Sequence, residues 1–324
     1  MLGYQLYKNI LTSIEEEGLL TIYDLAKGVV VGINEQLAKG QNLTSGTFLI
    51  LETVIDVLHG IMNFPYLLNI MEFNSEMGLD DIKPIILPDS FQDNFIDFNF
   101  LESLLNMLRF QSVPVALKAK CLRVLSKLPA VRKSVTRNPA VSDSFMIFCM
   151  RSVEVILSTN FGNEGENSID EVLDLISRLF LVYTVGELVR LPTSFHPFLN
   201  QLDSLLTHIF KDSYHLASTR SRQVNEILRS LLSESERCED DPMSKLLFNA
   251  IRKYFEIFFS PGSTHLALID ESVIGNSDSK ELKDYISGSL DLFEEAYRSC
   301  SDVKQTVLNE LVPGFIQNFT VAPL

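Results

Sequence analysis

Apolar residues recur every three or four positions along most of the chain. The first forty residues carry two such stripes, over 4–17 and 22–39, and a glycine follows each of them, Gly18 and Gly40. This spacing puts the apolar side chains on one face of a helix, and glycine is common just beyond a helix end. The pattern therefore predicts two helices at the start of the chain, each with one buried side.

Helical spacing continues to the end of the chain. No segment shows the strict alternation of apolar and polar residues that is typical of a half-buried strand. With 46% hydrophobic residues among 324, the chain has enough apolar material for a substantial core. We therefore predict an all-α fold. Its further helices are predicted over 47–62, 100–110, 114–128, 143–159, 169–189, 195–211, 221–235, 243–259, 279–299 and 302–319.

Two segments interrupt the helical pattern. Residues 73–98 contain Pro84, Pro88 and several aspartates, whereas residues 160–168 are polar and contain glycine. The first segment also contains apolar residues, so we expect it to pack against the helices. Neither has the low-complexity composition of a domain linker. We therefore predict one elongated α-helical domain over 1–324, with soft internal breaks near 73–98 and 160–168.

The predicted helices group into successive pairs. Pairs start about 40–50 residues apart, which is near the period of helical-pair repeats. A single pair buries only part of its apolar surface, and stacking on neighbouring pairs completes the core. This favours an irregular helical-repeat solenoid, with a globular multi-helix domain as the alternative. The pairs are 4–17 with 22–39, 100–110 with 114–128, 143–159 with 169–189, and 195–211 with 221–235.

One segment resembles a known repeat. In Ser112–Leu128 a small polar residue precedes Val113, and Ala119, Leu122 and Leu125 recur on one stripe. This arrangement resembles the second helix of a HEAT or armadillo repeat, although the arginine common soon after the valine is missing. The resemblance covers one repeat. It implies a scaffold that binds other proteins, of the kind found in karyopherins and other transport receptors.

The chain as a whole is acidic, with 27 Lys and Arg against 42 Asp and Glu and a net charge of −15. A surface of this sign repels a phosphate backbone, so a protein that coats nucleic acid is disfavoured. The same charge suits basic partners, such as targeting segments or histone-like tails.

One segment has the opposite charge. Between Glu102 and Asp143 no acidic residue occurs, and we call residues 109–137 the basic island. Lys120, Arg123 and Lys127 are three and four positions apart, so they share one helix face. We predict that the island contacts a partner. The predicted contact residues are Lys118, Lys120, Arg123, Lys127, Arg132, Lys133 and Arg137.

Several partners suit a basic surface of this kind. It can receive an acidic peptide, an anionic lipid headgroup or a nucleic-acid backbone. Aromatic residues do not interleave with the basic ones, which argues against stacking on single-stranded nucleic acid. The alternative is a solvated face whose charges pair with acidic residues, such as those in 234–241, of this chain or a neighbouring one.

Signatures of catalysis and metal binding are missing from the sequence. It contains no glycine-rich phosphate loop, no Gly-x-Ser-x-Gly turn and no His-Glu-x-x-His motif, and its four cysteines are far apart. We therefore expect no catalytic residues, no cofactor and no metal. The alternative is an enzyme or exchange factor on a helical frame, in which His196, His208 and His215 converge with acidic residues.

The remaining features favour an intracellular interaction protein. The first residues do not form a signal peptide, and Glu52 and Asp56 interrupt the most apolar stretch, so we expect neither secretion nor a membrane span. Widely spaced cysteines fit a reducing compartment, the cytoplasm or the nucleus. Three Leu-x-x-Leu-Leu strings, at 101–105, 202–206 and 228–232, are interpreted as buried stripes. We predict a non-catalytic scaffold or adaptor for one or more proteins, in transport or complex assembly.

Overall fold

The computed structural model describes residues 14, 18–64, 85, 87, 91, 94–131, 138–159, 161, 165–212, 214–237 and 280–299. These residues form helices and one isolated bridge, between Ile85 and Val131, and contain no strand. The prediction of an all-α fold is confirmed. The helices predicted over 243–259 and 302–319 lie outside the described residues, as does nearly all of 4–17.

The chain divides into two compact units, Met1–Tyr183 and Thr184–Leu324, each described here by itself. A single elongated domain over 1–324 stays a prediction. The first unit contains α2 (Leu19–Ala38), α3 (Ser45–Met62), α5 (Phe98–Arg109), α6 (Val115–Lys127), the 3-10 turn η3 (Leu128–Ala130), α7 (Pro139–Leu157) and α8 (Gly165–Val182). The second contains α9 (Val185–Val189), α10 (Pro192–Asp212), α11 (Tyr214–Arg237) and α14 (Lys280–Ser299).

Local sequence determines the helix ends of the first unit. Gly40 ends α2 with a φ of +71°, and its N–H donates to the Leu37 carbonyl while the Gln41 N–H donates to Gln36. This is a Schellman motif, in which glycine takes the left-handed conformation without strain. At the other ends, side chains satisfy the first free N–H groups of a helix. Thr44 caps α3, Asp97 caps α5 and Asn138 caps α7.

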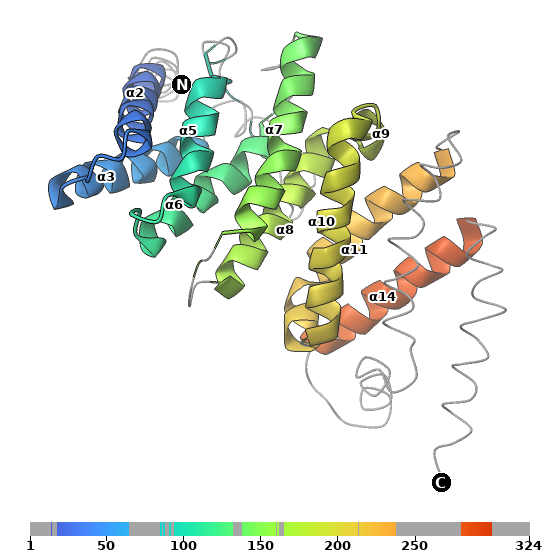
Figure 1. Ribbon diagram of the computed structural model, residues 1–324. Helices are drawn as coiled ribbons and strands as arrows, with labels where there is room; N and C mark the ends of the chain where they lie inside the picture. The colour runs from blue at the N-terminus through green and yellow to red at the C-terminus, as the bar shows by residue number, and fades with distance from the viewer. Residues whose placement is uncertain are drawn as a thin grey trace, which may run out of the picture. The chain divides into compact units, whose positions relative to one another are not determined.

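The helices of the first unit pack in two rows. In one row α2 packs on α5 and α5 on α7, and in the other α3 packs on α6 and α6 on α8. Within each pair the chain turns back, so α2 contacts α3, α5 contacts α6 and α7 contacts α8 (Figure 1). The structure thus brings together the predicted pairs 100–110 with 114–128 and 143–159 with 169–189. The structure pairs α2 with α3, the next helix along the chain. The predicted partner of 22–39, residues 4–17, lies almost entirely outside the described residues.

Where the structure describes the connection before α5, its apolar residues pack against the helices, as its composition predicts. Leu87, Phe91 and Phe95 are buried. The Phe95 ring stacks on Tyr23 of α2 at 5.3 Å between centroids, and the Tyr23 hydroxyl donates to the Phe95 carbonyl at 2.8 Å. Phe100 of α5 meets the same tyrosine ring edge-on. Aromatic contacts of this kind stabilise the junction between α2 and α5 beyond simple burial.

The predicted helix over 169–189 is two helices in the structure. Thr184 and Glu187 form a capping box, in which the Glu187 N–H donates to the Thr184 hydroxyl and the Thr184 N–H donates to the Glu187 carboxylate. Because this reciprocal pair starts a new helix, α8 ends at Val182 and α9 begins at Val185. In the second unit α11 then packs on α9, α10 and α14, so the predicted pair 195–211 with 221–235 is also present.

Candidate functional site

Helix α6 lies between α3 and α8 in the second row of the first unit. Pro114 precedes it in extended conformation, which suits a residue just outside a helix. The inward face of α6 is apolar and buried: Leu117, Cys121, Leu122, Val124 and Leu125. Four residues of the basic island lie on this helix, and we call them the α6 ridge: Lys118, Lys120, Arg123 and Lys127. The other predicted contact residues, Arg132, Lys133 and Arg137, lie outside the described residues.

Lys120 bridges α6 to α3. Its ammonium lies 2.7 Å from an Asp56 carboxylate oxygen and 2.9 Å from one of Glu52. The hydrogen bonds to Asp56 and Glu52 raise the pKa of Lys120 above its ordinary value, so the ammonium stays charged. One cation therefore serves two carboxylates that are one helical turn apart.

Arg123 and Ser126 connect α6 to α8 through one carboxylate. The Ser126 hydroxyl donates to Glu171 at 2.5 Å, and the Arg123 guanidinium lies 3.9 Å from the other oxygen of Glu171. Ser126 is buried, whereas the Arg123 side chain is 53% exposed. The serine therefore fixes the carboxylate, and the arginine remains the more accessible cation of this link.

Lys127 bonds to the end of α3. Its ammonium donates to the Asn63 side-chain oxygen, and Asn63 in turn donates to the His59 carbonyl at 2.8 Å. Burial, followed by the nearby positive charge of Arg178, lowers the pKa of Lys127. Burial, followed by Lys127 and Arg123, lowers the pKa of His59. Positive charge is therefore concentrated where α3 ends against α6.

Lys118 differs from the rest of the α6 ridge because it is buried, with 8% of the residue exposed. Burial lowers the pKa of Lys118. The other ridge cations contact acidic or amide groups of α3 and α8. A further carboxylate of α8, Asp174, pairs with Arg178 of the same helix at 3.0 Å. Counter-charges thus come from the flanking helices of the same unit. That the α6 ridge contacts a partner stays a prediction.

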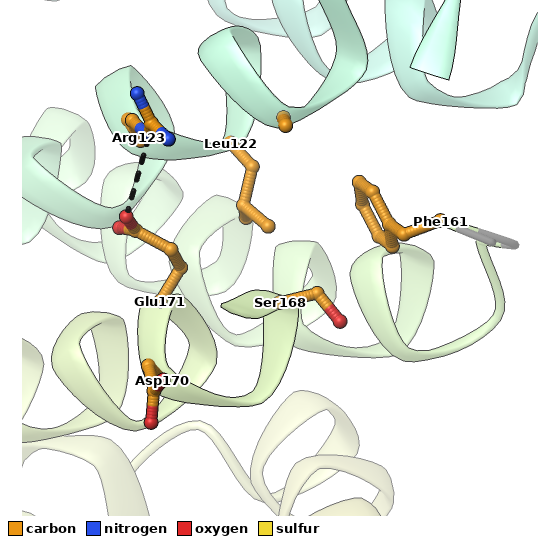
Figure 2. A pocket seen from close by; sticks show the side chains of 7 residues that line it. Leu122, Arg123, Phe161, Ser168, Asp170 and Glu171 are labelled. Carbon is orange, nitrogen blue, oxygen red and sulfur yellow. Dashed lines mark ion pairs between the residues drawn. The ribbon is translucent and has the colours of Figure 1, made fainter. Parts of the chain in front are cut away.

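A small pocket of about 220 Å³ opens between α6 and α8 (Figure 2). Leu122 and Phe161 face each other across it, and Arg123 and Glu171 meet at its edge. Ala119, Ser168 and Asp170 complete the lining. Pockets for whole cofactors or drug-sized ligands are usually about 300–1,000 Å³. This pocket is therefore smaller than such a site and has the size of a single side chain, with an apolar wall and a charged rim.

The residues proposed for an enzyme do not line this pocket. His196 and His208 are exposed on α10 of the second unit, twelve positions apart. His215 belongs to α11, but its side chain is not among those described. Within the described residues, no group of three His, Cys, Asp or Glu could hold a metal ion. Nothing in the described geometry therefore assembles these histidines into a catalytic cleft.

Two of the four cysteines are described, and both are buried free thiols. Burial raises the pKa of Cys121 to about 12 and also raises the pKa of Cys149. Since the thiolate is the reactive form, these cysteines are packing residues. All leucines of the three Leu-x-x-Leu-Leu strings are also buried, which confirms their interpretation as core stripes.

Helix α3 is the one described helix whose length and composition would suffice to cross a membrane. In the structure Leu51, Ile55 and Leu58 are buried within the first unit, and Glu52 and Asp56 bind Lys120. Its outward side nevertheless includes exposed apolar residues.

Comparisons with known proteins give one distant similarity. The chain is 21% identical over 185 residues to Ran-binding protein 16 of Drosophila melanogaster. The matched region is 57% of this chain and 16% of that protein, whose name states that it binds Ran. No family model matches the chain, and no solved structure matches it.

Proposed function

We propose that this protein is a non-catalytic helical scaffold that binds other proteins in nucleocytoplasmic transport or in complex assembly. The observation that carries this proposal is the two-row packing of successive helical pairs in the first unit. Such packing is what HEAT- and armadillo-like solenoids use to present long surfaces to partners. The similarity to a protein named for binding Ran supports a transport-related role and makes Ran the first partner to test.

The α6 ridge is the proposed contact for an acidic segment of a partner. Arg123 is its most accessible cation and is 3.9 Å from its own counter-ion. An incoming carboxylate can pair with this guanidinium in the bidentate geometry that arginine favours. Leu122 and Phe161 provide an apolar pocket beside it for a neighbouring side chain. Nucleic acid is the weaker candidate, because Glu52, Asp56 and Glu171 reduce the net positive charge of the α6 ridge.

The test is direct binding of the full chain to purified Ran, measured by calorimetry and by the mass of the complex. We expect a complex of fixed stoichiometry. If Ran does not bind, but a recombinant protein identified by affinity purification forms such a complex, the transport role is wrong and the scaffold role stands. If no protein forms a stoichiometric complex, the proposal is overturned.

A charge reversal tests the α6 ridge within the same complex. Arg123→Glu is expected to weaken binding of the acidic segment by about tenfold or more, as a lost charge-assisted contact does. The matched control is Arg298→Glu on α14, where the arginine is 74% exposed. Equal affinities of wild type and Arg123→Glu would show that the ridge is not the contact.

A further inference from the structure

The Glu171 carboxylate of α8 meets two side chains of α6, one through each oxygen. Its Oε2 accepts a hydrogen bond from the Ser126 hydroxyl at 2.5 Å, whereas its Oε1 lies 3.9 Å from the Nε of Arg123. A charge-assisted hydrogen bond between arginine and a carboxylate is about 2.7–2.9 Å long. Glu171 is therefore near enough to attract the guanidinium but is not hydrogen-bonded to it.

Ser126 determines where this carboxylate lies. Its side chain is buried, so water does not compete for its hydrogen bond. The hydroxyl has one proton and two acceptors within reach, the Glu171 carboxylate at 2.5 Å and the Arg123 carbonyl at 3.1 Å. The shorter bond, to the carboxylate, is the stronger one. While Ser126 holds Oε2 in this way, Glu171 cannot turn both oxygens toward Arg123, as bidentate pairing requires.

Arg123 remains accessible from solvent in this arrangement. Its side chain is 53% exposed, whereas that of Glu171 is 25% exposed. The Nε of Arg123 faces Glu171, and the terminal nitrogens of a guanidinium carry further N–H donors. The guanidinium also lies at the edge of the pocket between Leu122 and Phe161 (Figure 2). A carboxylate of a partner can therefore reach Arg123 while Glu171 stays on Ser126.

The opposite arrangement would close this site. If Glu171 were released from Ser126, the guanidinium 3.9 Å away could bind both of its oxygens. An internal carboxylate competes at a high effective concentration, because it is attached to the same folded unit as the cation. Such a pair would occupy Arg123 and exclude an acidic segment of a partner.

We infer that Glu171 is an internal competitor for Arg123, and that Ser126 is the positioning residue that holds it back and keeps the α6 ridge open to an acidic segment. The inference deepens the proposed function and rests on it. It also makes Glu171 a specificity-determining residue, because its negative charge lowers the affinity of every anion at Arg123.

A labelled peptide tests the inference on the full chain. The probe is Gly-Glu-Leu-Glu-Gly, which offers carboxylates beside one apolar side chain, and its affinity is measured by fluorescence anisotropy. Glu171→Gln is expected to tighten binding about two- to fivefold, the effect of one exposed charge pair, because the competing charge is removed while the side chain keeps its shape. Ser126→Ala is expected to weaken binding by a similar factor, because Glu171 is then free to pair with Arg123.

A double variant separates positioning from a general structural role of Ser126. In the Glu171→Gln background, Ser126→Ala should leave the affinity unchanged, since no competitor remains for the serine to hold. If Ser126→Ala had no effect in the wild-type background, or weakened binding equally in both backgrounds, the inference would be wrong. Equal affinities of wild type and Glu171→Gln, including no detectable binding by either, would also overturn it.

Two matched variants control for the loss of a buried hydroxyl and of one negative charge. Ser152 of α7 is also buried, and its hydroxyl donates to the Phe148 carbonyl at 2.8 Å. Glu154 is exposed on the same helix. Ser152→Ala and Glu154→Gln should both bind the peptide like wild type. A change in either control as large as in its counterpart would overturn the inference.

The proposed function is tested separately from this inference. Loss of partner affinity in Arg123→Glu, together with equal peptide affinities of wild type and Glu171→Gln, would leave the ridge as the contact and refute the internal competitor alone. Failure of the full chain to form any stoichiometric complex would refute the scaffold function, whatever the order of the peptide affinities.

Discussion

The two flanks of α3 differ in chemistry although they belong to one helix. Toward α6 the helix presents Glu52 and Asp56, and both are bound by Lys120. On the side turned away from α6 it presents Ile50 and Val57, which are 56% and 37% exposed. Between the flanks, a third face is buried. The comparison shows that polar residues of α3 hold the pair to its neighbour, whereas the exposed apolar residues have no such role in the described structure.

The largest expected effect is a difference in the free energy of unfolding between substitutions of two isoleucines on opposite faces of α3. Ile55 is fully buried, whereas Ile50 is 56% exposed. We expect Ile55→Ala to lower the free energy of unfolding of the first unit by about 2–5 kcal/mol, because it leaves a cavity in the core. Ile50→Ala should change it by about 0.5 kcal/mol or less. Urea unfolding, followed by circular dichroism, measures both.

The reverse order of these two effects would contradict the assignment of the faces. A large loss in Ile50→Ala would mean that this side of α3 is already covered in the free chain.

The ion pairs on the polar flank of α3 should contribute less to the stability of the first unit than the buried face of the helix. We expect the coupling between Lys120 and Asp56, measured by a double-mutant cycle with Lys120→Met and Asp56→Asn, to be about 0.2–1 kcal/mol. The pair lies at the surface, with 27% and 56% of the two side chains exposed, so water and salt weaken it. The coupling should decrease further as salt is raised. A coupling above about 3 kcal/mol, or one insensitive to salt, would show that the pair is shielded from solvent.

Sequence periodicity predicted most of the described helices and several of their ends. The buried stripe of α6, the glycine after α2 and the predicted pair 100–110 with 114–128 are all local signals, and local signals can be recognised without a structure. The split between α8 and α9 was also signalled locally, by Thr184 and Glu187 at capping-box spacing. The apolar spacing on either side of them concealed it.

The sequence alone could not predict which acidic residues contact the basic residues of α6. Lys120 meets Asp56 from 64 positions away, and Ser126 meets Glu171 from 45 positions away. Residues 234–241 were named only as an example of acidic partners for a solvated face, and 238–241 lie outside the described residues, whereas the described partners come from α3 and α8. Charges at such separations meet only because α3, α6 and α8 pack in one row, and periodicity within a helix carries no information on which row it joins. The spacing of Glu52 and Asp56 on one face was the sole local hint.

The smallest expected effect is the pH dependence of stability that His59, near the end of α3, contributes. Burial, and then the charges of Lys127 and Arg123, lower the pKa of His59, whereas the unfolded chain has a histidine pKa of about 6.5. Below about pH 7 the unfolded chain therefore binds more protons at this position than the folded one. The contribution to stability is complete above that pH and declines as the pH falls through 6.5 toward the folded value.

Two variants sharpen this last prediction. His59→Gln should remove part of the loss of stability between about pH 7 and pH 5, because the titrating group is gone. Lys127→Met should raise the pKa of His59 toward its ordinary value, as followed by the imidazole signals in NMR, since one of the nearby cations is removed. Lys27→Met on α2 is the matched control and should leave that pKa unchanged. If Lys127→Met also left the pKa of His59 unchanged, burial alone would account for its lowering. The positive charge of Lys127 would then have no measurable effect on the end of α3.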